Sequence, residues 1–157
     1  MTTSTGFMHN PAGQLVDAFE RVARRALHDL DFLHPAMPVH ASRFTLFESQ
    51  WVGCLIAPWM LSALILPGPD QVWERRAIGD KIALALPSGT VLFTVGELDD
   101  LGQYLACSLM SPLARGLTVE QGVRLTDDCA QMLLSLPVDA PDVRRRALLL
   151  GRSPSNA

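Results

Sequence analysis

The stretch from Ser49 to Pro69, SQWVGCLIAPWMLSALILPGP, contains no charged residue. Its length is close to the ~20 residues of a helix that crosses a bilayer. Pro58 stands near its middle and a Pro-Gly-Pro sequence closes it, and prolines obstruct a helix. No Lys/Arg cluster flanks either end, as a membrane span would favour. We therefore expect two buried β-strands that meet at Pro58, and no direct membrane insertion.

The composition indicates one domain over residues 1–157, with flexible ends at about 1–9 and 152–157. Hydrophobic residues make up 48% of the chain, which is enough to build a core. The formal net charge is −3, so no broad basic field is available to attract nucleic acid. The N-terminal residues do not follow the pattern of an export signal. We therefore expect a cytoplasmic protein that does not bind nucleic acid.

Two segments have the periodicity of amphipathic helices. Asn10 and Pro11 are typical of a helix start, and apolar residues then recur at spacings of three and four to about His28. Thr118 and Gln121 form a capping-box pattern before a second helix that we expect to end near Ser135.

Between these helices the apolar pattern changes to that of β-strands. The expected runs are SRFTLFE, WVGCLIAP, WMLSALILP, KIALALP, TVLFTVG and GQYLACSLMSP, of which the last could also be a short helix. The short connections favour antiparallel neighbours. The predicted class is α+β: an antiparallel sheet of about five to six mostly sequential strands, flanked by an N-terminal and a C-terminal helix. We expect both helices to pack on one face of the sheet.

That arrangement leaves apolar surface unexplained. In the runs 52–56 and 60–66 both alternating faces are apolar, which is typical of strands buried on both sides. Two short helices can cover one face of such a sheet, but hardly two. Either the sheet curls towards a barrel, or some apolar surface is left for another protein.

Motifs for catalysis or metal binding are absent from the sequence. It contains no CxxC, HxxxH, HExxH, GxSxG or glycine-rich phosphate loop. Cys54, Cys107 and Cys129 are odd in number and lie on apolar patterns, so neither a disulfide framework nor a metal site is expected. We predict no cofactor. Asp127 and Asp128 are adjacent helical residues, which favours solvated surface. The three arginines at 144–146, which precede the sequence ALLL, are likewise expected to lie on the solvated surface.

Two blocks, PWM at 58–60 and PGPDQVW at 67–73, are candidates for contacts with a protein partner. Trp and Met are enriched in interface cores, and turns on rigid scaffolds often carry contacts, although core packing stays open for each Trp. Acidic residues after the TVLFTVG run could form a docking patch. The predicted partner-binding residues are Trp59, Met60, Pro67, Gly68, Pro69, Asp70, Trp73, Glu97, Asp99 and Asp100.

Three long blocks resemble the HybE family (also called HupJ or HoxT) of [NiFe]-hydrogenase assembly chaperones. They are FESQWVGCLIAPWMLSALILPGPDQVW, PSGTVLFTVGELDDLGQYLACSLMSPL and GVRLTDDCAQMLLSLPV. The likeness runs from about Gln14 to Gly151. It implies a non-enzymatic cytoplasmic protein that binds the hydrogenase small-subunit precursor, with its twin-arginine signal peptide, and/or the large subunit. Such binding delays export until the cofactors are in place.

The resemblance gives the acidic residues a candidate role. A twin-arginine leader has a cationic head and an apolar stretch, so its receptor would offer carboxylates beside apolar surface. We hypothesise that Asp70, Glu97, Asp99 and Asp100 lie at one rim of the apolar sheet surface. The alternatives are a small redox or iron carrier, an enzyme that uses Cys54 or Cys107, and a self-assembling subunit. The sequence leaves the oligomeric state open.

Overall fold

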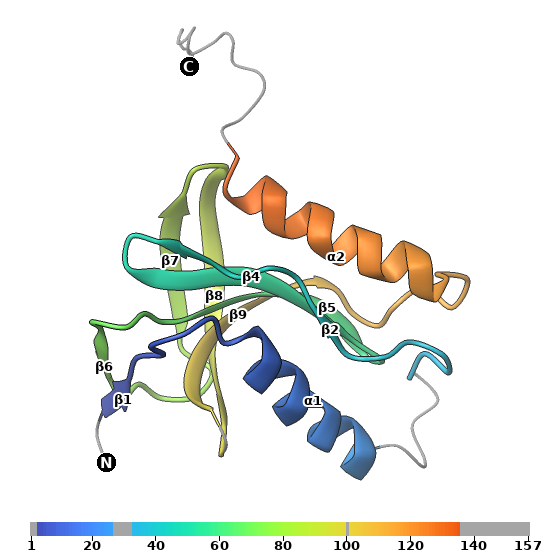
Figure 1. Cartoon of the computed structure of the whole chain (residues 1–157), viewed down its shortest axis with the longest axis horizontal. Helices are drawn as coiled ribbons and strands as arrows, with labels where there is room; N and C mark the ends of the chain where they lie inside the picture. Colours follow the sequence, from blue (N-terminus) through green and yellow to red (C-terminus); the bar gives the residue numbers. More distant parts are fainter. Residues whose placement is uncertain (1–2, 27–32, 100, 136–157) are drawn as a thin grey trace, which may run out of the picture.

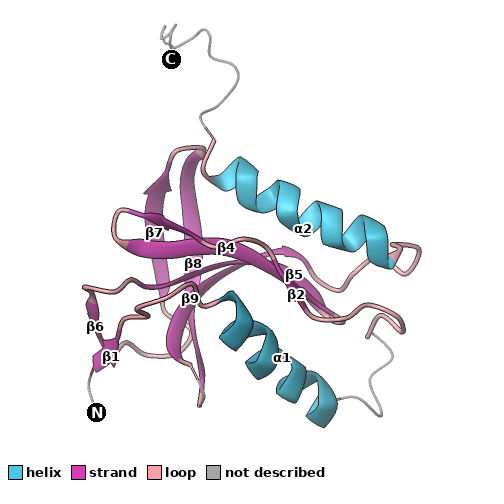
Figure 2. Ribbon diagram, in the orientation of Figure 1, coloured by secondary structure: helices cyan, strands magenta, loops and turns pink. Residues whose placement is uncertain are grey.

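The computed structural model describes residues 3–26, 33–99 and 101–135 (Figure 1). Within them a twisted antiparallel sheet lies between two helices (Figure 2). The helices are α1 (Ala12–Ala26) and α2 (Val119–Leu133). The strands are β1 (Thr3–Thr5), β2 (His40–Ala41), β3 (Thr45–Phe47), β4 (Gln50–Ala57), β5 (Met60–Pro67), β6 (Val72–Glu74), β7 (Lys81–Leu86), β8 (Gly89–Leu98) and β9 (Gly102–Met110). The predicted fold class is confirmed.

Both helices begin where their capping residues predict. The Asn10 side-chain oxygen accepts a hydrogen bond from the Ala12 N–H at 3.0 Å. At α2 the Thr118 hydroxyl accepts from the Gln121 N–H, and the Gln121 amide oxygen accepts from the Thr118 N–H, which completes the capping box. The described part of the first helix ends at Ala26, and the predicted end at His28 lies outside the described residues.

The main sheet has the strand order β2-β4-β5-β9-β8-β7, with β3 also paired to β4. All its pairings are antiparallel, and the GQYLACSLMSP run is a strand and not a helix. The β4–β5 hairpin turns at Pro58, so the uncharged stretch forms two neighbouring strands as predicted. Residues 3–5, expected in a frayed tail, instead pair with β6 in a separate two-stranded ribbon.

The expectation that both helices share one face of the sheet is wrong. Alternate residues of β4 and β5 belong to two different clusters, one under each helix. Ala130 and Leu133 of α2 lie in the cluster with Cys54, whereas Leu15 of α1 lies in the cluster with Leu55. Figure 1 shows the two helices on opposite sides of these strands. Because both strand faces are apolar, each face needs its own cover, and one helix supplies each.

The other end of the sheet is covered by its own curvature. In Figure 2 β7 and β8 run steeply across the direction of β4. As a result Ile82 and Leu84 of β7, with Phe93 of β8, join the same cluster as the α2-facing side chains of β4 and β5. Phe93 is fully buried there. The sheet therefore curls, which is one of the two solutions that the apolar pattern left open.

Candidate functional site

A groove lies where the curled sheet meets the segment that follows β5. Its volume is about 280 Å³. One wall is the segment 72–76, which we call the arm, and the other is the concave face of β7, β8 and β9. The side chains that line this Trp73 groove are Gln50, Val72, Trp73, Glu74, Arg76, Ile82, Leu84, Val95, Gln103, Tyr104 and Leu105. The lining is thus mainly apolar, with a few polar groups from the arm and the sheet.

The start of the arm is fixed by the side chain of Gln71. Its amide oxygen accepts hydrogen bonds from the Gly68 N–H and from the indole N–H of Trp73, each at 3.1 Å. The Trp73 ring packs against the α2-side cluster and is half-buried. Gln71 therefore orients Trp73 while the ring still presents part of its surface to the groove.

The end of the arm is fixed by Gln103 of β9. This side chain is 3% exposed, and its amide donates to the Arg76 carbonyl at 2.7 Å and accepts from the Arg76 N–H at 2.9 Å. These two hydrogen bonds resemble those between paired strands, because the Gln103 amide bonds both the backbone N–H and the backbone carbonyl of Arg76. The arm is thereby attached to the sheet without belonging to it.

An exposed ion pair provides a third attachment. The Arg75 guanidinium donates to both carboxylate oxygens of Glu97, at 2.9 and 2.6 Å. These hydrogen bonds hold the pKa of the Glu97 carboxyl below its usual value. The predicted acidic residue Glu97 thus acts first on the arm, and its carboxylate has a cationic partner within the chain.

Apolar surface is exposed beside the groove. Val72 is 63% exposed although it lines the groove wall, and Ile78, two residues after the arm, is 64% exposed. Large exposed apolar groups beside an apolar hollow are typical of a surface that a partner covers. This groove is therefore the best candidate for a binding site.

Trp59 and Met60 lie on the other side of the sheet. Their side chains pack against the α1-side cluster, and the Trp59 ring stacks on Phe19 of α1 with ring centroids 6.4 Å apart. Trp59 and Trp73, which flank β5 in the sequence, therefore belong to opposite faces. They cannot contact one small ligand together.

The Pro-Gly-Pro turn is largely covered. Pro67 and Gly68 are buried, and the Phe7 N–H donates to the Pro67 carbonyl at 3.0 Å. A Cβ on Gly68 would lie 1.7 Å from the Ser49 carbonyl oxygen, so only glycine fits this close backbone approach. Pro69 is half-buried and Asp70 is exposed. Asp70 is the residue of this turn whose side chain is most available to a partner.

The remaining predicted acidic residues lie near α1. Glu97 and Asp99 line a small hollow with Arg21 and Arg25, and Asp99 is exposed. Asp100 lies outside the described residues. The structure thus brings Glu97 to the arm through Arg75 and brings Asp99 to the arginine-bearing side of α1.

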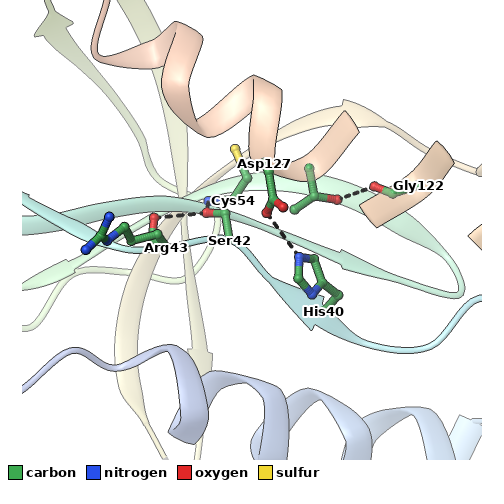
Figure 3. Close-up of polar contacts among 7 residues, drawn as sticks. His40, Ser42, Arg43, Cys54, Gly122 and Asp127 are labelled. Atoms are coloured by element: carbon green, nitrogen blue, oxygen red, sulfur yellow. Dashed lines mark hydrogen bonds and ion pairs between the residues drawn. The ribbon is translucent and has the colours of Figure 1, made fainter. Parts of the chain in front are cut away.

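A second hollow lies between α2 and the edge formed by β2 and β3. His40 and Asp127 form a contact across it, with Nε2 and Oδ1 3.1 Å apart (Figure 3). The Ser42 hydroxyl accepts from the buried Cys54 N–H at 2.9 Å and donates to the Arg43 carbonyl at 3.2 Å. These groups already have partners within the chain, and the His40–Asp127 contact joins α2 to the sheet edge.

The three cysteines converge beneath α2 and remain free thiols. Cys54 and Cys107 are both in register with Ala63, on strands either side of β5, and Cys129 comes from α2. Burial is the main cause that raises the pKa of the Cys54 thiol to about 12, and it also raises the pKa of Cys129. Neither thiol is activated as a nucleophile. Within residues 3–26, 33–99 and 101–135, no group of three or more His, Cys, Asp or Glu could hold a metal ion.

Sequence reasoning identified Trp73 but missed Gln71 and Gln103. Gln71 stands beside the predicted turn, two residues from the Trp73 indole that it fixes. Gln103 stands inside an apolar run that forms a central strand. A side-chain amide that is buried in an apolar strand requires a polar partner. The presence of Gln103 in this run was therefore the sequence signal that could have revealed its role.

Comparisons with known proteins agree on one family. The family model described as "[NiFe]-hydrogenase assembly, chaperone, HybE" matches residues 10–151. The chain is 63% identical over 150 residues to the hydrogenase-2 operon protein HybE of Escherichia coli K12, covering 94% of this chain and 93% of that protein. It is 28% identical to the hydrogenase expression/formation protein HoxT of Azotobacter vinelandii, covering 89% and 91%.

A solved structure supports the fold directly. The solution structure of HybE from Escherichia coli superposes with a TM-score of 0.73 at 59% sequence identity, covering 99% of this chain and 98% of that one. In the part of the chain that the structure describes, no helix is long and apolar enough to traverse a membrane.

Proposed function

Because the chain belongs to the HybE family of [NiFe]-hydrogenase assembly chaperones, we propose that it binds immature hydrogenase subunits in the cytoplasm. The proposed client is the small-subunit precursor with its twin-arginine signal peptide, the large subunit, or both. Binding covers the leader and delays export until the cofactors are inserted. The protein needs no catalytic group for this role.

The Trp73 groove is the observation that carries the proposal for the leader. Its apolar lining and the exposed Val72 suit the apolar stretch of a signal peptide. Asp70 precedes the arm, Glu74 lines the groove and Glu97 pairs with Arg75 of the arm, and a cationic head could approach these acids. We therefore place the leader along the arm, with its apolar part against Trp73.

Separate Trp substitutions test this placement. Trp73→Ala is expected to weaken binding of a leader-bearing small-subunit precursor by at least about thirtyfold, as loss of an interface anchor does. Trp59→Ala removes a ring of the same type from the α1 side, and we expect affinity to be kept. Titration calorimetry measures both. Equal affinity of the Trp73→Ala variant and the unmodified protein would remove Trp73 from the client site.

Charge reversal tests the acidic part of the proposal. We expect the Asp70→Lys, Glu97→Lys double variant to recover less small-subunit precursor in a pull-down. Because Glu97→Lys also breaks the pair with Arg75, its control is Glu97→Lys combined with Arg75→Glu, which restores an ion pair of reversed polarity. If the double variant recovers as much precursor as the unmodified protein, these acids are not part of the client site.

The rival functions have less support in the structure. The Cys54 thiol is buried and has a raised pKa, which disfavours an enzyme that uses it as nucleophile. An iron or redox carrier is tested by elemental analysis of the purified protein, where stoichiometric iron would favour that role over the chaperone.

A further inference from the structure

The Trp73 groove lies next to a sheet edge that no described residue occupies. β7 is the last strand in the sheet order, and β8 is its neighbour there. Its sequence KIALAL contains one charge and no proline, so it lacks most of the devices that protect exposed edges. Ile82 and Leu84 of this strand line the groove. A strand added to β7 would place alternate side chains in the groove.

The described chain ends near the turn that joins β7 to β8. The Leu133 carbonyl of α2 accepts a hydrogen bond from the Ser88 N–H at 3.4 Å, and Ser88 lies in the turn between β7 and β8. Along a strand, Ser88 and Leu84 are separated by roughly 13 Å, at about 3.3 Å per residue. Residues 136–143 can span up to about 25 Å. The segment that follows them can therefore reach the groove.

The sequence of that segment matches the groove chemically. Residues 144–151 read RRRALLLG, a cationic head followed by an apolar stretch. Because leucines occupy 148, 149 and 150 in succession, either strand register directs at least one leucine to the groove. The match to the family model runs over residues 10–151, so it includes this segment and leaves out the last six residues.

The charges also complement each other. Residues 136–157 carry four arginines and two aspartates, a net charge of +2. Since the whole chain has a formal net charge of −3, residues 1–135 carry −5. Opposite charges raise the local concentration of the segment at the rest of the chain.

We propose that residues 144–151 bind in cis to the Trp73 groove as an added strand beside β7. The segment has the same order of cationic and apolar parts as the leader in the proposed function. It therefore acts as an internal competitor that the client must displace, and this last step rests on the proposed function. Within the chain, its role is to cover the apolar groove and the β7 edge when no client is bound.

Hydrogen exchange in the full-length protein tests the docking. The Leu148→Ser, Leu149→Ser, Leu150→Ser triple variant is expected to exchange the β7 amides at least about tenfold faster than the unmodified chain. Ser153→Ala, Ser155→Ala changes the same tail outside the family match and should leave β7 unchanged. β4 and β5 amides report that the fold is intact. Equal β7 exchange in the triple variant and the unmodified chain would overturn the proposal.

A photo-cross-linker at Leu149 locates the contact. The expected product joins residue 149 to a peptide that contains Trp73 or Leu84 of the same molecule, as judged with a mixture of isotopically light and heavy chains. Cross-links between light and heavy chains, or to the hollow between α2 and β3, would contradict docking in cis at this groove.

A synthetic leader peptide separates this inference from the proposed function. If the segment occupies the groove about nine-tenths of the time, the triple Leu→Ser variant should bind the peptide about tenfold more tightly than the unmodified chain. Unchanged affinity with β7 protection intact would overturn the competition. No peptide binding by either protein, with β7 protection and the cross-link as expected, would overturn the leader proposal and support the docking.

Discussion

The two ends of the sheet bury their apolar residues in different ways. At β4 and β5 each face has its own helix, and the side chains of residues 61–67 are all buried. At β7 the side chains of Ile82 and Leu84 are half-buried and the opposite face is exposed, with Leu92 of the neighbouring strand 57% exposed. A short arm held by three side chains replaces a helix there. The comparison shows that this protein concentrates its buried apolar residues at one end of the sheet and accessible apolar surface at the other.

Truncation of matched leucines should expose this difference most strongly. Leu64→Ala in β5 is expected to lower the free energy of unfolding by about 2–5 kcal/mol, because it leaves a cavity under α1. Leu92→Ala in β8 is expected to stay within about 0.5 kcal/mol of the unmodified protein. Urea denaturation measures both. Similar losses for the two variants would show that the ends are equally packed.

Removal of the amide that holds the arm should have a smaller effect. Gln103→Ala deletes two hydrogen bonds to Arg76 and is expected to cost about 1–3 kcal/mol. The change should also increase hydrogen exchange in residues 72–76 while β4 keeps its protection. Gln14→Ala, an exposed change on α1, serves as the control. Unchanged exchange in the arm would mean that other contacts hold it.

Labelling of the Cys54 thiol tests how tightly β4 is packed beneath α2. Cys54 is fully buried and its pKa is raised to about 12, so labelling at pH 8 is expected only when the chain unfolds. Because the unfolded thiol loses its proton near pH 9 and the folded one does not, stability should fall as pH rises from 9 towards 12. Mass spectrometry of alkylated peptides identifies the thiol. Fast native labelling of Cys54 would contradict the tight packing of β4 beneath α2.

The Arg75–Glu97 pair should contribute least. Arg75 lowers the pKa of Glu97, so the contribution is present above the unfolded pKa of a glutamate and is lost as pH falls through the lower folded value. The melting temperature of the unmodified protein should therefore drop slightly more below about pH 4 than that of Glu97→Gln. Because the pair is exposed, 1 M salt should reduce the difference. Parallel pH profiles would show that the pair adds nothing.

Local chemistry made much of the fold predictable from the sequence. The capping box at Thr118 and the turn at Pro58 act through neighbouring residues, so their structural effects follow from short patterns. The side of the sheet on which each helix packs was not predictable in this way. It depends on how strongly the sheet curls, which is set by contacts between strands distant in sequence, such as Phe93 with the α2-side cluster.

The candidate site was predictable only in part. Trp73 is recognisable as a large aromatic residue after a rigid turn. The Pro-Gly-Pro turn is held by the Phe7 N–H, which bonds the Pro67 carbonyl, and the arm depends on Gln103 pairing with a residue 27 positions away. Neither partner can be identified from the local sequence. The turn was therefore expected to be exposed, whereas the structure shows that it is largely covered. The acids were recognised as a group, yet Glu97 already pairs with Arg75.

The central claim, that the client binds the Trp73 groove, is tested most directly by two matched charge insertions. Val72→Asp places a carboxylate in the groove wall, and Leu92→Asp places one on the opposite face of the sheet at similar exposure, 63% and 57%. Titration calorimetry with the leader-bearing small-subunit precursor compares them. We expect Val72→Asp to abolish measurable binding and Leu92→Asp to bind like the unmodified protein. Equal binding by both variants, or loss with Leu92→Asp alone, would contradict the account.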